Sequence, residues 1–139
     1  MIEEGVHVFP VRVYYEDTDF SGYVYHANYL KFLERARTEL IRELGMDQRA
    51  MFDAEGGPTH FVVAGMRIIW KRPALMDDLI TVETRLGKLR GASVTLEQVI
   101  LRGPEVLLTA SVDIAHLAAG RPVRMADWMH EAFEKAAGL

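Results

Sequence analysis

The pattern of apolar and polar positions is strand-like at the start of the chain and then becomes helical. Residues 6–15 are rich in β-branched and aromatic side chains and predict a strand. Over residues 27–44 the apolar side chains recur at helical spacing and predict one long helix, about 27 Å in length. Gly45 follows at the position where a C′ glycine ends a helix. The apolar face of this helix consists of Tyr29, Leu33, Ala36, Leu40 and Leu44.

After Gly56-Gly57-Pro58 the apolar period changes from helical spacing to two residues. Residues 60–70 are apolar on nearly both faces, which predicts a central strand. Three more strands are expected over residues 79–86, 92–102 and 106–117, with a turn at Gly103-Pro104. A short terminal helix is expected over residues 127–137, with Asp127 as its N-cap.

This order of elements predicts an α+β fold in a single domain, residues 1–139. Consecutive strands joined by short turns favour an antiparallel sheet, and the long apolar-faced helix has to lie against it. One helix on one face of an open sheet leaves apolar surface over, so a homo-oligomer is expected.

Composition narrows the class of protein. The chain has 16 Lys and Arg against 20 Asp and Glu, a net charge of −4, which argues against a nucleic-acid partner. No apolar run approaches the roughly 18 residues of a transmembrane segment, and the acidic N-terminus does not resemble a secretory signal. There is no cysteine, which excludes disulfides and thiolate chemistry and fits a reducing compartment. We therefore expect a soluble, cytoplasmic domain.

Several common catalytic signatures are absent. The sequence has no Gly-x-Ser-x-Gly elbow, no Walker loop and no Gly-x-Gly-x-x-Gly fingerprint. Its five histidines are not paired at metal-ligand spacing, so no metal is predicted.

The most informative segment is residues 14–29. It places the carboxylates of Asp17 and Asp19, a glycine turn at Gly22, and then His26 and Asn28 at the entry of the long helix. Backbone N–H groups in the first turn of a helix lack partners and can bind an anion or polarise a carbonyl oxygen. A carboxylate folded back over them could attack that carbonyl or activate water. The alternative interpretation is a capping cluster, because Asp and Asn before helices are commonly caps.

Residues 14–19 and 25–37 closely resemble the acyl-CoA thioesterases of the YbgC type, in the 4-hydroxybenzoyl-CoA thioesterase branch of the hotdog superfamily. The match continues more weakly through Arg72-Pro73-Ala74 and residues 77–79. The resemblance implies a hotdog fold, in which a curved antiparallel sheet of about five strands wraps a long helix. It also implies hydrolysis of acyl-CoA thioesters with no cofactor, CoA being part of the substrate. Family members form dimers, often tetramers, with the active site at the dimer interface.

Carried over by position, the catalytic carboxylate falls on Asp19, as general base or as nucleophile. The helix N-terminus that polarises the thioester carbonyl falls near Tyr25-His26. Phe20-Ser21 and Tyr23 depart from the residues common in the family, which affects the expected acyl preference rather than the reaction.

The neighbouring residues have weaker assignments. His26 either orients the thioester or water, or is only a polar helix-terminus residue. Asp17 is expected to be structural, and Asn28 to brace the turn; Tyr25 and Asn28 are also predicted to be substrate-binding residues. Tyr15 either lines the acyl pocket or is simply packed. Lys88 and Arg90 suit CoA phosphates, although a solvated hairpin tip is the alternative and is slightly favoured; Arg121 and Arg124 are weaker candidates.

Two other functions remain open from the sequence. One is a hotdog dehydratase or hydratase acting on hydroxyacyl thioesters, which pairs a His with a carboxylate in a different arrangement. The other is a non-catalytic protein that binds acyl thioesters or acts as a scaffold.

Overall fold

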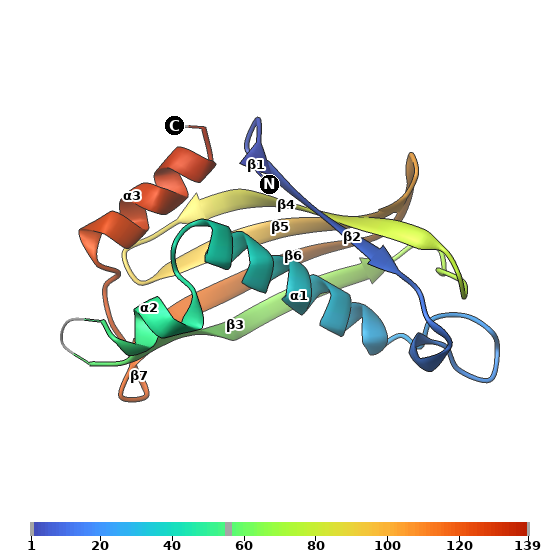
Figure 1. The fold of residues 1–139 in the computed structure, drawn as a ribbon, viewed down its shortest axis with the longest axis horizontal. Helices are drawn as coiled ribbons and strands as arrows, with labels where there is room; N and C mark the ends of the chain where they lie inside the picture. The colour runs from blue at the N-terminus through green and yellow to red at the C-terminus, as the bar shows by residue number, and fades with distance from the viewer. Residues whose placement is uncertain (1, 55–56, 139) are drawn as a thin grey trace.

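The computed structural model describes residues 2–54 and 57–138 as an antiparallel sheet with a long helix across one face (Figure 1). The strands are β1 (Ile2–Glu3), β2 (Val6–Arg12), β3 (Thr59–Trp70), β4 (Leu79–Leu89), β5 (Ser93–Arg102), β6 (Glu105–Ala118) and β7 (Arg121–Pro122). They follow the order β1-β2-β4-β5-β6-β3, with β7 paired to β6. The α+β hotdog architecture predicted from the sequence is thus confirmed, and β1 and β7 are short additions to its five long strands.

The long helix α1 (Asn28–Glu43) lies against the sheet where its apolar stripe predicts. Tyr29, Leu33, Ala36 and Leu40 are buried in the core, together with Phe32. The helix ends as predicted: Gly45 has φ +86°, its N–H donates to the Arg42 oxygen, and the N–H of Met46 donates to the Ile41 oxygen. This is a Schellman motif, which only a residue tolerant of positive φ forms without strain.

Two smaller helices complete the inner face. The helix α2 (Gln48–Phe52), in a stretch that the sequence analysis left irregular, is capped by the Asp47 side chain, which accepts from the Ala50 N–H at 2.8 Å. The helix α3 (Asp127–Ala136) buries Met129 and Phe133. Its predicted N-cap was wrong by one residue. Ala126 is the N-cap, and Asp127 begins the helix, where its charge still favours the positive end of the dipole.

Two strand predictions need correction. The first strand ends at Arg12, and the 3-10 helix η1 (Tyr15–Asp17) follows it, because the chain must turn toward α1. Residues 60–70 were predicted to form a central strand, yet β3 is the edge of the sheet and pairs only with β6 among the described residues. Apolar residues on both faces therefore do not mean a central position here. Val63, Ile69 and Trp70 remain 46–53% exposed on this edge.

Candidate functional site

The loop between β2 and α1 folds as two small hydrogen-bonded turns. The first is η1, and the second is a hairpin-like turn in which Thr18 pairs with Val24. The Asp19 N–H donates to the Tyr23 oxygen and the Gly22 N–H to the Asp19 oxygen, both at 3.0 Å. Gly22 has φ +85°, which explains the glycine at this point of the turn. This geometry places the Asp19 side chain at the surface, beside the start of α1.

Asp17 is a structural residue, as the sequence predicted. Its carboxylate is buried and accepts from the Tyr14 N–H and from the Asn28 Nδ2, both at 2.9 Å. Its backbone oxygen accepts from the Tyr25 N–H at 2.9 Å. These bonds join η1 to the first residue of α1, so Asn28 does brace the turn.

Asp19 is exposed, and its contacts are confined to its own turn. One oxygen, Oδ1, accepts from the Ser21 N–H at 2.8 Å and also from the Ser21 hydroxyl. These two bonds, first the hydroxyl and then the backbone one, lower the pKa of the Asp19 carboxyl, and the charge of His26 adds to the effect. Asp19 is therefore a carboxylate at neutral pH.

The N-terminus of α1 is open beside this carboxylate. Its N-cap is Ala27, and no side chain in the described chain caps it, so the capping-cluster interpretation does not hold for α1. The Tyr25 N–H is occupied by Asp17, which removes one of the two expected donors. The His26 N–H, in contrast, has no acceptor within residues 2–54 and 57–138, and it can donate to a substrate oxygen.

A surface pocket of about 360 Å³ contains this arrangement. Asp19, Ser21 and His26 line it on one side, and the end of β3 and the following segment line it on the other. The rings of His26 and Trp70 meet edge to face with their centroids 6.3 Å apart. Asp19 is the only acid among the described lining residues, whereas Lys71 and Arg72 supply positive charge. The pocket thus pairs a carboxylate with an unused N–H donor and suits an anionic substrate.

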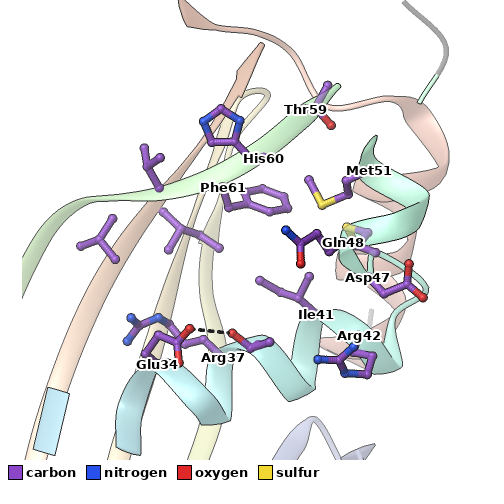
Figure 2. A pocket seen from close by; sticks show the side chains of 15 residues that line it. Glu34, Arg37, Ile41, Arg42, Asp47, Gln48, Met51, Thr59, His60 and Phe61 are labelled. Atoms are coloured by element: carbon purple, nitrogen blue, oxygen red, sulfur yellow. Dashed lines mark hydrogen bonds between the residues drawn. The ribbon is translucent and has the colours of Figure 1, made fainter. Parts of the chain in front are cut away.

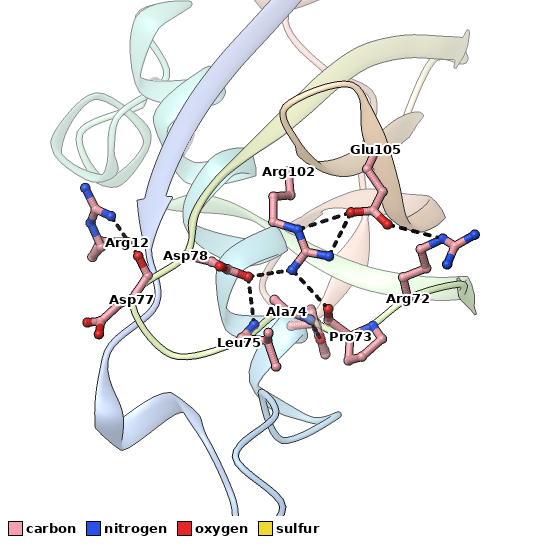
Figure 3. A network of polar contacts seen from close by, with 10 residues as sticks. Arg12, Arg72, Pro73, Ala74, Leu75, Asp77, Asp78, Arg102 and Glu105 are labelled. Atoms are coloured by element: carbon pink, nitrogen blue, oxygen red, sulfur yellow. Dashed lines mark hydrogen bonds and ion pairs between the residues drawn. The ribbon is translucent and has the colours of Figure 1, made fainter.

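An ion-pair network on neighbouring strands holds the segment that faces this loop (Figure 3). The Arg102 guanidinium contacts the Asp78 carboxylate at 2.6 Å and Glu105 at 2.7 Å, and donates to the Pro73 oxygen at 3.4 Å. Glu105 in turn pairs with Arg72 at 3.3 Å. Arg72-Pro73-Ala74 and residues 77–79, where the family resemblance continues more weakly, therefore belong to a segment that supports the loop between β2 and α1.

That segment is bonded directly to the loop between β2 and α1. The Val24 N–H donates to the Ala74 oxygen at 2.9 Å, and the Ala74 N–H donates to the Tyr29 hydroxyl at 2.9 Å. Sequence reasoning missed Ser21, Trp70 and Arg102 as parts of the site. Only the bulky and polar departures at positions 20 and 21 pointed toward Ser21.

Three predicted binding residues lie away from Asp19 in this chain. Tyr15 is in η1 rather than in a strand, and its side chain is 80% exposed, so it is not packed and does not line the Asp19 pocket. Lys88 and Arg90 are exposed at the β4–β5 hairpin, where the Arg90 guanidinium donates to Thr95 at 3.2 Å. Strand pairing puts this hairpin at the opposite end of the sheet from Trp70.

A second cavity, which the sequence did not indicate, lies between α1, α2 and β3 (Figure 2). It measures about 290 Å³, and its wall includes Glu34, Arg37, Met51 and His60. Arg37 is buried and donates to the Gln98 side chain at 3.0 Å; burial lowers the pKa of its guanidinium, which Glu34 partly offsets. The sequence feature that could have indicated this cavity is Arg37, an arginine beside the apolar face of the predicted helix.

The described residues hold no cluster of three or more His, Asp or Glu side chains arranged for a metal ion. No helix in the same part of the chain is long and apolar enough to cross a membrane.

The sequence profile of the thioesterase-like superfamily matches residues 13–133. The chain belongs to this superfamily. It is 42% identical over 121 residues to the acyl-CoA thioesterase YbgC of Haemophilus influenzae, covering 87% of both chains. These matches confirm the YbgC-type resemblance that the sequence segment indicated.

Solved structures agree with this membership. A probable thioesterase from Bartonella henselae superposes with a TM-score of 0.84 at 46% identity, covering 87% of this chain and 99% of the other. A Thermus thermophilus thioesterase solved with coenzyme A and Zn superposes with a TM-score of 0.82 at 29% identity, covering 99% and 98%.

Proposed function

We propose that this chain hydrolyses acyl-CoA thioesters to a free acid and CoA, with no cofactor. The observation that carries the proposal is the exposed Asp19 carboxylate beside the unused His26 N–H at the open end of α1. A thioester carbonyl accepting from that N–H would have a nucleophile or base beside its carbon. The names of the similar proteins support the same reaction.

The reaction can follow two balanced routes. As general base, Asp19 takes a proton from water, the water oxygen bonds to the carbonyl carbon, the C–S bond breaks, and the CoA thiolate leaves and takes a proton. As nucleophile, an Asp19 oxygen bonds to the carbon and expels the thiolate, and water then cleaves the resulting anhydride. The lowered pKa of Asp19 keeps its carboxyl ionised at neutral pH, which both routes require.

His26 has two roles in this proposal. Its backbone N–H stabilises the oxyanion that develops on the thioester oxygen. The centroid of its ring lies 4.6 Å from that of Tyr25 and 6.3 Å from that of Trp70. The ring forms a wall that orients the acyl group. The Tyr25 side chain acts through its ring contact with His26, and Asn28 acts by bracing the loop through Asp17.

We also propose that two copies pair along β3, as a dimer or as a tetramer of two dimers. The free edge of β3 carries exposed Val62, Val63, Ile69 and Trp70, and its only exposed charged side chain in the described structure is Arg67. Such an edge is a template for strand pairing. Because Trp70 also lines the Asp19 pocket, a partner on this edge would shelter the site.

The same pairing explains how Lys88 and Arg90 could bind CoA although they lie far from Asp19 in their own chain. When two β3 strands pair antiparallel, the two sheets run in opposite directions. The end of the partner's sheet that carries its β4–β5 hairpin then lies beside the end of this sheet that carries Asp19. The partner's β4–β5 hairpin could then approach the phosphates of CoA. Light scattering should give at least a dimer, and a stable, fully active monomer would contradict the shared site.

The test of the reaction is release of free thiol from short, long and aromatic acyl-CoAs. Release with at least one substrate is expected; no release with any of them would exclude the thioesterase proposal. Enoyl absorbance after addition of a 3-hydroxyacyl-CoA would reveal a dehydratase, and binding without turnover would reveal a scaffold.

We further propose a cytoplasmic location, which the absence of cysteine supports. Cell fractionation with antibody detection should recover the protein with cytoplasmic markers.

A further inference from the structure

The two oxygens of the Asp19 carboxylate have different surroundings. Oδ1 accepts from the Ser21 N–H and from the Ser21 hydroxyl. The Ser21 oxygen itself accepts from the Tyr23 N–H at 3.2 Å. Since that N–H uses a lone pair of the hydroxyl oxygen, the hydroxyl proton is directed at Asp19.

No other residue in the described chain donates to Oδ2, so it is the oxygen free to meet water or an acyl carbon. A carboxylate bonded on one oxygen loses the freedom to rotate. The geometry therefore makes one of two chemically equal oxygens the reactive one before substrate arrives.

We propose that Ser21 is a positioning residue that commits Oδ1 to the turn, leaves Oδ2 for the reaction, and extends activity to lower pH. This inference rests on the proposed function for its kinetic consequence.

The expected pH effect follows from the charges around Asp19. The pKa of its carboxyl is lowered, and the Ser21 hydroxyl is the largest cause, followed by the Ser21 N–H and more weakly by the Asp19 backbone N–H and the charge of His26. Lys71 and Arg72 also line this pocket, from the segment after β3. Because Asp19 acts only when ionised, removing the hydroxyl should move the acid limb of kcat/KM to higher pH.

The matched variants are Ser21→Ala, Ser21→Thr and Thr18→Val. Ser21→Ala removes the hydroxyl and keeps the backbone bond, whereas Ser21→Thr restores a hydroxyl. Thr18→Val removes a neighbouring hydroxyl that donates to the Tyr15 oxygen at 2.7 Å and does not touch the Asp19 carboxylate.

For Ser21→Ala we expect the acid limb to move to higher pH and the plateau kcat to fall about three- to tenfold, the size of one lost hydrogen bond to a charged group. KM should change less than kcat, because Ser21→Ala removes one oxygen from the pocket wall and none of the groups proposed to bind CoA. Ser21→Thr should return the limb toward that of the parent, and Thr18→Val should not move it. Superimposable profiles for Ser21→Ala and the parent would overturn the proposal.

A readout independent of activity is the ¹³C NMR titration of the Asp19 carboxyl, assigned with Asp19→Asn. The midpoint of this titration should move to higher pH in Ser21→Ala and should not change in Thr18→Val. An unmoved titration in Ser21→Ala would overturn the Ser21 assignment even if the parent hydrolyses thioesters. A parent without thiol release would exclude the proposed function, while a moved titration would still support the Ser21–Asp19 contact.

Discussion

The two halves of the loop between β2 and α1 place two aspartates in opposite situations. Asp17 is buried, and both of its carboxylate oxygens accept hydrogen bonds from other parts of the loop and helix. Asp19 is exposed and is bonded on one oxygen only, by a residue of its own turn. A carboxylate with satisfied oxygens builds structure, and one with a free oxygen at the mouth of a pocket can react. Two acids separated by one residue therefore have different roles.

The largest effect is expected for Asp19→Asn. The amide keeps the size of the side chain but loses its charge and basicity, so turnover should fall about a hundredfold or more. The melting temperature should hardly change, because Asp19 is exposed and caps no helix. Turnover on the best acyl-CoA and thermal unfolding measure the two effects. Near-parental turnover in a folded protein would show that the reactive acid was wrongly assigned.

Asp17→Asn should have the opposite signature. An amide at this position presents an NH₂ group to one of two donors, the Tyr14 N–H or the Asn28 Nδ2, and leaves that donor unsatisfied in a buried site. The free energy of unfolding should fall by about 1–3 kcal/mol, visible as a lower denaturant midpoint. The folded fraction should keep much more activity than Asp19→Asn. Equal loss of turnover in both variants would remove the distinction between the two halves.

A smaller effect is expected at the support beneath the Asp19 half. Arg102→Met removes contacts to Asp78, Glu105 and the Pro73 oxygen, which hold the segment that accepts from the Val24 N–H. We expect about 1–2 kcal/mol lower stability and a severalfold lower kcat, since the Arg102 side chain is 31% exposed.

Arg85→Met is the matched control for Arg102→Met. Its ion pair with Glu83 at 3.5 Å is more exposed and far from Asp19, so stability should change by less than about 0.5 kcal/mol. If both arginine variants behave alike in denaturant unfolding and in kcat, the network does not support the loop.

The smallest effect is expected from charge reversal at Lys88 and Arg90, which touch neither half of the loop. KM for acyl-CoA should rise about fivefold with little change in kcat, because exposed charge contacts contribute about 1 kcal/mol at most and act equally on ground and transition states. Kinetics on CoA and pantetheine thioesters compare substrates with and without the nucleotide. Equal parental kinetics on both would show that these residues do not hold it.

Local pattern was sufficient for much of the fold and for part of the site. The apolar stripe and Gly45 predicted α1 and its end to within one residue, because side-chain period and a left-handed C′ glycine are properties of neighbouring residues. All four later long strands were predicted to within three residues at each end. The segment around Asp19 and His26 was found because its order of residue types is continuous in sequence.

Tertiary structure alone decided the rest, because those features depend on which distant groups meet. Whether β3 is central or at an edge depends on strand order, and an apolar run does not encode that order. Asp17 is satisfied by Asn28, eleven residues away, and Arg102 reaches a loop twenty-nine residues away at Pro73. The sequence assigned different roles to Asp17 and Asp19, but it did not show which groups each carboxylate would contact. In the folded chain Asp17 is buried with both oxygens hydrogen-bonded, whereas the bonds to Asp19 from Ser21 leave one oxygen free.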